Sequence, residues 1–232
     1  MLSQKQLKEV ETLFALGAHL GHKKSRLHPK ARKNVYQIIN GTSVIDLTNT
    51  VTQIEKAQEF LKDCAKNNKT VLVVGTKKTA SSIVKEYCEN NSVAYVSAKW
   101  LPGLLTNFKT IMENVKKLND LKIQLESTDE SIHIKHEKVK MQKHIAKLER
   151  LYGGFSLLTK LPDVLVLIDT KKEKNAVKEA RSYNIPIVAL IDTNANPEEV
   201  EYPVVCNDDT IEVVKHVLET LMSEYVSNKS VN

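Results

Sequence analysis

The sequence predicts a doubly wound α/β fold with a mainly parallel sheet. Uninterrupted apolar runs of strand length, such as TVLVVG (70–75) and IPIVALID (185–192), are typical of strands that are buried on both faces. Segments with helical spacing of apolar residues lie between these runs, and this alternation indicates parallel strands covered by helices. Residues 108–152 have no strand pattern, so we expect them to form an inserted helical pair.

The N-terminal part is predicted to contain a helix, a basic stretch and two short strands. Residues 4–17 keep helical spacing of apolar side chains up to a glycine, which favours a short amphipathic helix. The basic stretch that follows contains Pro29 and is expected to be extended or looped. Residues 35–47 indicate two extended pieces around Asn40-Gly41, a common turn pair.

The sheet part then alternates regularly to the C-terminal end. Thr48 or Asn49 is expected to cap a helix with a buried stripe up to residue 65. We expect strands at 70–75, 93–96, 163–169, 185–192 and 202–205. We expect helices over 80–88, 176–180 and 211–225.

The segment without strands carries two heptad seams. These seams comprise Ile111, Val115, Leu118 and Leu125, then Ile134, Met141, Ile145, Leu148 and Tyr152. Residues 127–131 supply turn and capping chemistry, which favours an antiparallel hairpin projecting from the sheet. A partner-binding or dimerising coiled coil remains an alternative. The predicted division is 1–47 for the N-terminal helix and basic arm, 48–107 with 153–232 for the sheet domain, and 108–152 for the hairpin.

The charges of the chain are separated along its length. Of the formal net charge of +6, all is carried by residues 1–33, which hold eight Lys or Arg and two Glu. Residues 182–214 hold seven acids and no Lys or Arg. Clustered cations bind a phosphate backbone by releasing its counterions, so this pattern favours a nucleic-acid partner. A solvated N-terminal arm would have the same composition and stays an alternative.

Composition excludes several other classes of protein. With 41% apolar residues the 232-residue chain is too apolar for a disordered polymer, and no run of about 20 apolar residues suggests a membrane span. Cys64, Cys88 and Cys206 are odd in number and far apart, which argues against a disulfide framework or a zinc knuckle. No secretory signal is recognisable, so we expect a cytoplasmic protein.

Candidate catalytic or ligand sites are weak. Gly75-Thr76-Lys77 lies where a strand meets a helix, but the chain lacks the further glycines of a phosphate loop. The LIDT repeat places Asp169 and Asp192 at strand ends, where with Asp208 they could form a Mg²⁺ site of an α/β enzyme. Helix or turn capping by these aspartates is the interpretation we favour.

Histidines do not improve the case for a site. His19, His22 and His28 have no Cys or carboxylate ligands nearby in the sequence, which argues against zinc. We therefore expect no catalytic residue, no metal and no cofactor.

Several segments together resemble one family. They are GAHLGHKKSRLHPKARKNVYQIINGTSVIDLTNT (17–50), VLVVGTKKTA (71–80), KWLPGLLTNFKT (99–110) and the run from LPDVLVLIDT to CNDDT (161–210). In this order they resemble the bacterial-type ribosomal protein S2 family over nearly the whole chain.

The resemblance implies a flavodoxin-like sheet with an inserted coiled-coil hairpin and no catalytic activity. It also implies a place between the head and body of the small ribosomal subunit, contact with small-subunit rRNA, and a role in docking ribosomal protein S1. We expect no membrane association and no homo-oligomer, and an organellar ribosome is the less favoured location.

Candidate RNA-binding residues combine the basic arm with cations near the ends of two strands. They are Lys23, Lys24, Arg26, Lys30, Arg32, Lys33, Lys77, Lys78, Lys99, Trp100, Asn107 and Lys109. The indole of Trp100 can stack on a splayed base or cover the root of the hairpin, and of the two we favour packing.

Overall fold

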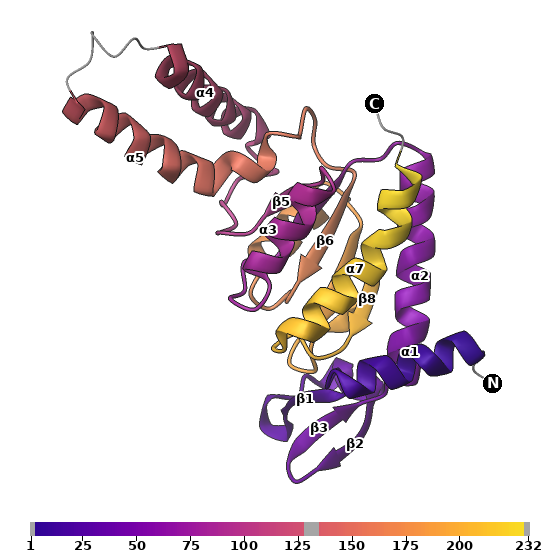
Figure 1. The fold of residues 1–232 in the computed structure, drawn as a ribbon. Coiled ribbons are helices and arrows are strands. Elements are labelled where there is room, and N and C mark those ends of the chain that lie inside the picture. Colours follow the sequence, from indigo (N-terminus) through magenta and orange to yellow (C-terminus); the bar gives the residue numbers. More distant parts are fainter. Residues whose placement is uncertain (1–2, 128–134, 230–232) are drawn as a thin grey trace.

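The fold is a five-stranded parallel sheet with a small antiparallel sheet at one end and a long helical hairpin at the other (Figure 1). The structure is a computed structural model that describes residues 3–127 and 135–229. The helices are α1 (Gln4–Ala15), α2 (Leu47–Lys66), α3 (Ser81–Asn90), α4 (Phe108–Ser127), α5 (Lys135–Tyr152), α6 (Lys174–Ser182) and α7 (Ile211–Asn228). The strands are β1 (Leu20–Lys23), β2 (Val35–Ile39), β3 (Thr42–Ile45), β4 (Val71–Val74), β5 (Ala94–Val96), β6 (Val164–Ile168), β7 (Ile187–Ile191) and β8 (Tyr202–Val205).

The large sheet confirms the predicted α/β class and its parallel strands. Its order is β5-β4-β6-β7-β8, and every neighbouring pair is parallel. Counted from β4, this is the order 2-1-3-4-5 found in flavodoxin-like sheets, and the chain reverses direction across the sheet between β4 and β6. Ligands and partners of such folds gather at the carboxyl ends of the strands, which here face the small sheet (Figure 1).

Both faces of the sheet are buried, which explains why its strands show no polar alternation. One face packs on α2, α3 and α7, and the side chains of Val73, Val166 and Val188 point to it. The other face packs on α6 and on the loop before α4. The side chains of Leu72 and Leu165, which alternate along the strands with those of the first face, point to it. Successive residues of each strand thus enter two different cores.

The helix after the small sheet begins earlier than predicted. Its cap is Asp46, neither Thr48 nor Asn49, and its first residue is Leu47. The Asp46 carboxylate accepts hydrogen bonds from the Thr48 backbone N–H at 3.0 Å and from the Asn49 side chain. The two residues expected to cap the helix are therefore donors to the actual cap.

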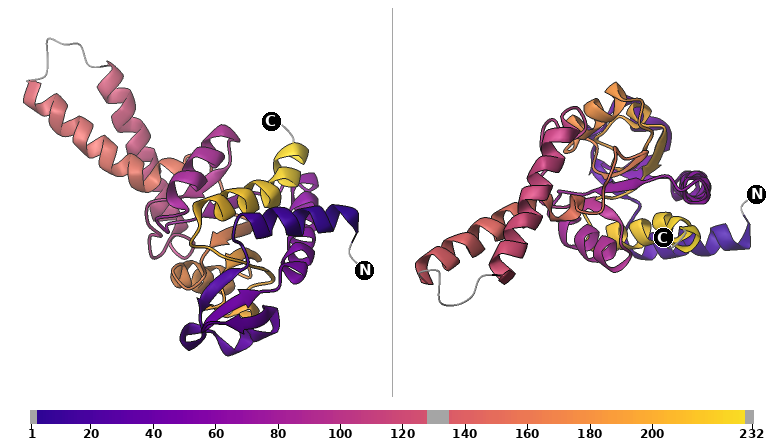
Figure 2. Two further views of the ribbon diagram at one scale, coloured as in Figure 1. Left: turned by 60° about the horizontal axis from the view of Figure 1, so that its bottom comes forward. Right: turned by 90° about the horizontal axis from the view of Figure 1, so that it is seen from above.

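The hairpin of α4 and α5 is present between β5 and β6 and projects away from the sheet (Figure 2). Ile111, Val115, Leu118 and Ile145 of the predicted seams are buried. Lys122 and Glu149 pair across the two helices at 2.6 Å. The predicted turn at 127–131 and the seam residue Ile134 lie outside the described residues, Ser127 apart.

The basic stretch is more regular than expected. Leu20–Lys23 forms β1, which pairs with β3, and the remainder folds into two short 3-10 helices, η1 (Lys24–Arg26) and η2 (Pro29–Asn34). The two predicted extended pieces around Asn40-Gly41 are confirmed as β2 and β3. The basic arm, which we define as residues 20–34, is therefore built onto a three-stranded sheet.

Candidate nucleic-acid interface

The basic arm is fixed to the carboxyl edge of the large sheet through the loop after β7. The Thr193 hydroxyl accepts the His22 backbone N–H at 2.9 Å, and the Thr193 carbonyl accepts that of His28 at 2.9 Å. Gly21 permits this approach, because a Cβ at its position would lie 2.8 Å from the Thr193 side chain. The arm is thus held at the start and in the middle of its basic run and presents a fixed surface.

All six cations of the arm are exposed, but they differ in their partners. Lys30 and Lys33 share the exposed carboxylate of Glu198, at 2.5 and 3.3 Å, and these ammonium groups lower the pKa of Glu198. Within the described residues, no carboxylate lies within ion-pair distance of Lys23, Lys24, Arg26 or Arg32. Exposed pairs such as those of Glu198 are weak and break readily when a phosphate competes.

Several acidic side chains of residues 182–214 contact other parts of the same chain. Asp192 contacts His22, Glu198 contacts the arm, and Asp208 contacts Lys77. The Glu201 carboxylate accepts the Ile187 backbone N–H at 2.8 Å. The separation of charge along the sequence is therefore partly neutralised in the fold, and the outward side of the arm keeps its positive charge.

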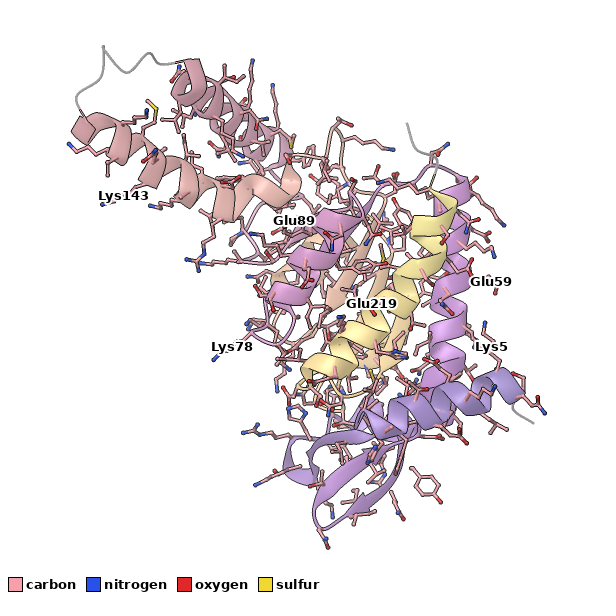
Figure 3. All side chains as sticks on the ribbon, viewed as in Figure 1. Lys5, Glu59, Lys78, Glu89, Lys143 and Glu219 are labelled. Carbon is pink, nitrogen blue, oxygen red and sulfur yellow. The ribbon has the colours of Figure 1, made fainter. Side chains whose placement is uncertain are left out.

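Lys77 and Lys78 are neighbours with different surroundings. Lys77 is 17% exposed, and its Nζ lies 2.6 Å from both Asp208 and Asp209 and 3.7 Å from Asp169. Lys78 is exposed and points away from the body of the molecule (Figure 3). Lys78 is the better placed of the two to reach a phosphate, whereas Lys77 is engaged by its own chain.

The cluster around Lys77 has unusual protonation equilibria. Burial of Asp208 and the charge of Asp169 raise the pKa of Asp208 to about 7, against the lowering effect of Lys77. Burial alone would lower the pKa of Lys77, but the surrounding carboxylates outweigh it and raise the pKa. The pKa of Asp209 is lowered, chiefly by its hydrogen bond to Lys77 and less by the charges of His22 and Arg26.

Residues at the root of the hairpin divide into exposed and buried groups. Lys99, Asn107 and Lys109 are exposed, and the Asn107 side chain accepts a hydrogen bond from Thr110 in the first turn of α4. Trp100 is 5% exposed and belongs to the core beneath α6. The packing that we favoured for Trp100 is therefore confirmed, and its buried indole is removed from the candidate RNA-binding residues.

Glu179 of α6 organises the loop that carries Trp100. Its carboxylate accepts the Trp100 indole N–H at 3.1 Å and the backbone N–H groups of Gly103, Leu105 and Thr106 at 2.9–3.3 Å. Sequence reasoning gives no signal for this role, since a glutamate within an amphipathic helix is usually solvated. The contact fixes the loop before α4 and hence the direction of the hairpin.

We expect Glu179→Gln to destabilise the protein by about 2 kcal/mol. Both carboxylate oxygens of Glu179 accept charge-assisted hydrogen bonds, whereas the glutamine amide is uncharged and has only one acceptor oxygen. The emission maximum of Trp100, the only Trp of the chain, should also shift. Urea unfolding and fluorescence of the same samples measure both. Glu113→Gln, an exposed glutamate of α4, is the control and should change neither quantity. Unchanged unfolding of the Glu179 variant would contradict the assigned role.

The sequence also matches a known protein family. A family model described as "Ribosomal protein S2" matches residues 13–227. The chain therefore belongs to the ribosomal protein S2 family. It is 39% identical over 207 residues to the small ribosomal subunit protein uS2 of Coprothermobacter proteolyticus, and the match covers 89% of this chain and 77% of that protein.

Ribosomal protein S2 is a non-enzymatic ribosomal protein, so the alternative of a magnesium-dependent enzyme is wrong. The geometry agrees, because the Lys77 ammonium lies between Asp169 and Asp208 where a Mg²⁺ ion would have to bind. No helix within residues 3–127 and 135–229 has a stretch apolar and long enough for a bilayer.

Proposed function

We propose that this chain is a structural constituent of the small ribosomal subunit that binds small-subunit rRNA through the basic arm. The observation that carries the proposal is the fixed, outward presentation of six cations, four of which have no carboxylate within ion-pair distance in the described part of the chain. Such a surface suits the phosphate backbone of folded RNA, and its recognition follows RNA shape more than sequence.

Further parts of the proposal rest on the family resemblance. The protein occupies a place between the head and body of the subunit and helps to dock ribosomal protein S1, and it acts in the cytoplasm. Residues 1–47 comprise the N-terminal helix and the RNA-binding arm, residues 48–107 and 153–232 form the sheet domain, and residues 108–152 form the inserted coiled-coil hairpin. Lys78, Lys99, Asn107 and Lys109 form a second, smaller group of RNA contacts, supported by their exposure.

The test replaces the four unpaired cations of the arm, Lys23, Lys24, Arg26 and Arg32, with glutamine. Between about 0.05 and 0.2 M salt, the slope of log affinity against log salt for folded small-subunit rRNA should become less steep by about three, because each lost phosphate contact removes nearly one released counterion. Filter binding of the full chain measures this slope. Adding Lys30→Gln and Lys33→Gln should flatten it further by a smaller step, since Glu198 already holds these two.

A matched variant separates the arm from general charge. Lys56, Lys85, Lys178 and Lys215 are exposed on four different helices, and their replacement by glutamine removes the same net charge. This control should keep most of the wild-type slope. An equal loss in both variants would show non-specific attraction, and an unchanged slope in the arm variant would rule out the arm as the RNA contact.

A further inference from the structure

A cleft of about 970 Å³ lies between α3 and the root of the hairpin. Residues of α3 such as Ser82 line one side, residues of α5 such as Ala146 line the other, and β5 contributes Tyr95. Lys78 lines the cleft just before α3 begins, and Glu89 lines it near the other end of α3 (Figure 3). No residue of the basic arm, all of which the structure describes, lines the cleft, so it is a separate surface.

Two of the cations that line the cleft are balanced by acids within it. Lys122 lies 2.6 Å from Glu149 across the hairpin, and Lys85 lies 3.9 Å from Glu89 one turn further along α3. No other described acid lines the cleft. The charge of the cleft is therefore set by its remaining cations.

Three lining cations have no acidic partner. Lys78 precedes α3, Arg150 lies in the last turn of α5, and Lys172 precedes α6. All three are exposed, and no carboxylate of residues 3–127 or 135–229 lies within ion-pair distance of them. The Lys172 ammonium donates a hydrogen bond to the Thr76 carbonyl at 2.9 Å, which keeps it at the edge of the cleft. Cations that reach one cleft from three elements attract an extended polyanion.

The rest of the lining favours a nucleic acid over an acidic peptide. Tyr95 is half-buried, and Leu157, in the loop after the hairpin, is 52% exposed. Ser82 and Ser92 add exposed hydroxyl groups near the two ends of α3. Bases pack on apolar and aromatic side chains, and hydroxyl groups bond to ribose. A run of aspartates or glutamates would bring only charge and would leave these apolar groups uncovered.

The size of the cleft selects a single strand. Cavities of about 300–1,000 Å³ typically enclose one small ligand, so this cleft has room for a few nucleotides. A duplex is far too wide for such a space, and its bases are already paired with each other. Only a single strand can bring its bases to Tyr95 and Leu157 while its phosphates reach the cations at the edge.

We propose that this cleft binds a single-stranded segment of RNA, a few nucleotides long. Its phosphates contact Lys78, Arg150 and Lys172, and its bases pack on Tyr95 and Leu157. The site goes beyond the contact of the basic arm with folded rRNA and rests on the proposed function only in taking RNA as the partner.

The test measures the fluorescence anisotropy of a labelled oligouridylate of about ten nucleotides, titrated with the full chain at about 0.05 M salt. Replacing Lys78, Arg150 and Lys172 together with glutamine should weaken binding by about tenfold or more, because three phosphate contacts are lost. The double variant Lys78→Gln with Arg150→Gln leaves the bond from Lys172 to Thr76 intact and should weaken binding by about fivefold. Circular dichroism checks that both variants fold.

A matched variant controls for general charge. Lys56, Arg181 and Lys215 are exposed on α2, α6 and α7, and their replacement with glutamine removes the same charge. This control should weaken oligouridylate binding by less than about threefold. The arm variant with Lys23, Lys24, Arg26 and Arg32 replaced should also keep it within about threefold, while the cleft variant should keep most of the salt slope for folded rRNA. The two proposals can therefore fail separately.

Several results would overturn the cleft as a site for single-stranded RNA. They are no measurable binding of oligouridylate by the wild type, and an equal loss in the control and the cleft variant. Equally tight binding of a duplex of the same length would contradict the selection of single strands. Displacement of the oligouridylate by polyglutamate as readily as by unlabelled polyuridylate would show that the cleft attracts acidic chains in general.

Discussion

Replacing Gly154 with alanine is expected to destabilise the protein by about 3 kcal/mol or more and to loosen the root of the hairpin. Gly154 lies in η3 (Gly153–Phe155), directly after α5, and an added Cβ would overlap the backbone carbonyl oxygen of Tyr95. Tyr95 belongs to β5, whose pairing with β4 fixes its position. A shift of the Tyr95 backbone would break the pairing of β5 with β4, and a shift of the Gly154 backbone would displace the root of the hairpin.

The adjacent glycine provides the control. A Cβ at Gly153 would meet only the Glu149 side chain, at 3.3 Å, and this long side chain can turn aside. Gly153→Ala should therefore change the free energy of unfolding by less than about 1 kcal/mol. Urea unfolding, followed by the fluorescence of Trp100, measures both variants. Equal effects of the two substitutions would show that the contact with Tyr95 does not set the requirement.

This pair of glycines illustrates where sequence reasoning reaches its limit. The strands, the helices and the hairpin were predictable because apolar periodicity is a local property that the sequence displays directly. The need for glycine at one of two adjacent positions depends on Tyr95, which belongs to a strand that precedes the whole hairpin in the chain. Nothing in the local pattern distinguishes Gly153 from Gly154.

The candidate interface, too, has features that the sequence displays and contacts that only the fold creates. The arm and its charge were visible as composition, because its cations are contiguous. The different roles of Lys77 and Lys78 were not visible, since the carboxylates of Asp169 and Asp208 come near Lys77 only once the sheet has formed. The partner of Trp100 was equally hidden, because Glu179 approaches it from α6.

Replacing Lys77 with methionine is expected to cost about 3 kcal/mol of stability near pH 8, because it leaves the nearly fully buried Asp208 without its cation. Methionine keeps the length and most of the apolar stem of the side chain, so packing is largely preserved. Lys78→Met removes the same charge one position later from an exposed site and should change stability by less than about 0.5 kcal/mol. Urea unfolding of both variants beside the wild type measures the difference.

Acidification should shrink the deficit of the Lys77 variant. In the folded wild type, burial and the neighbouring Asp169 raise the pKa of Asp208 to about 7, above its unfolded value of 3.8. Because the folded state then binds more protons than the unfolded state between these values, protonation of Asp208 stabilises the fold as the pH falls through this window. A neutral Asp208 no longer needs the ammonium, so at about pH 5 the variant should recover roughly half of its loss. A deficit that stays constant from about pH 8 to pH 5, or grows, would mean that Lys77 acts through packing and that the charge of Asp208 plays no part.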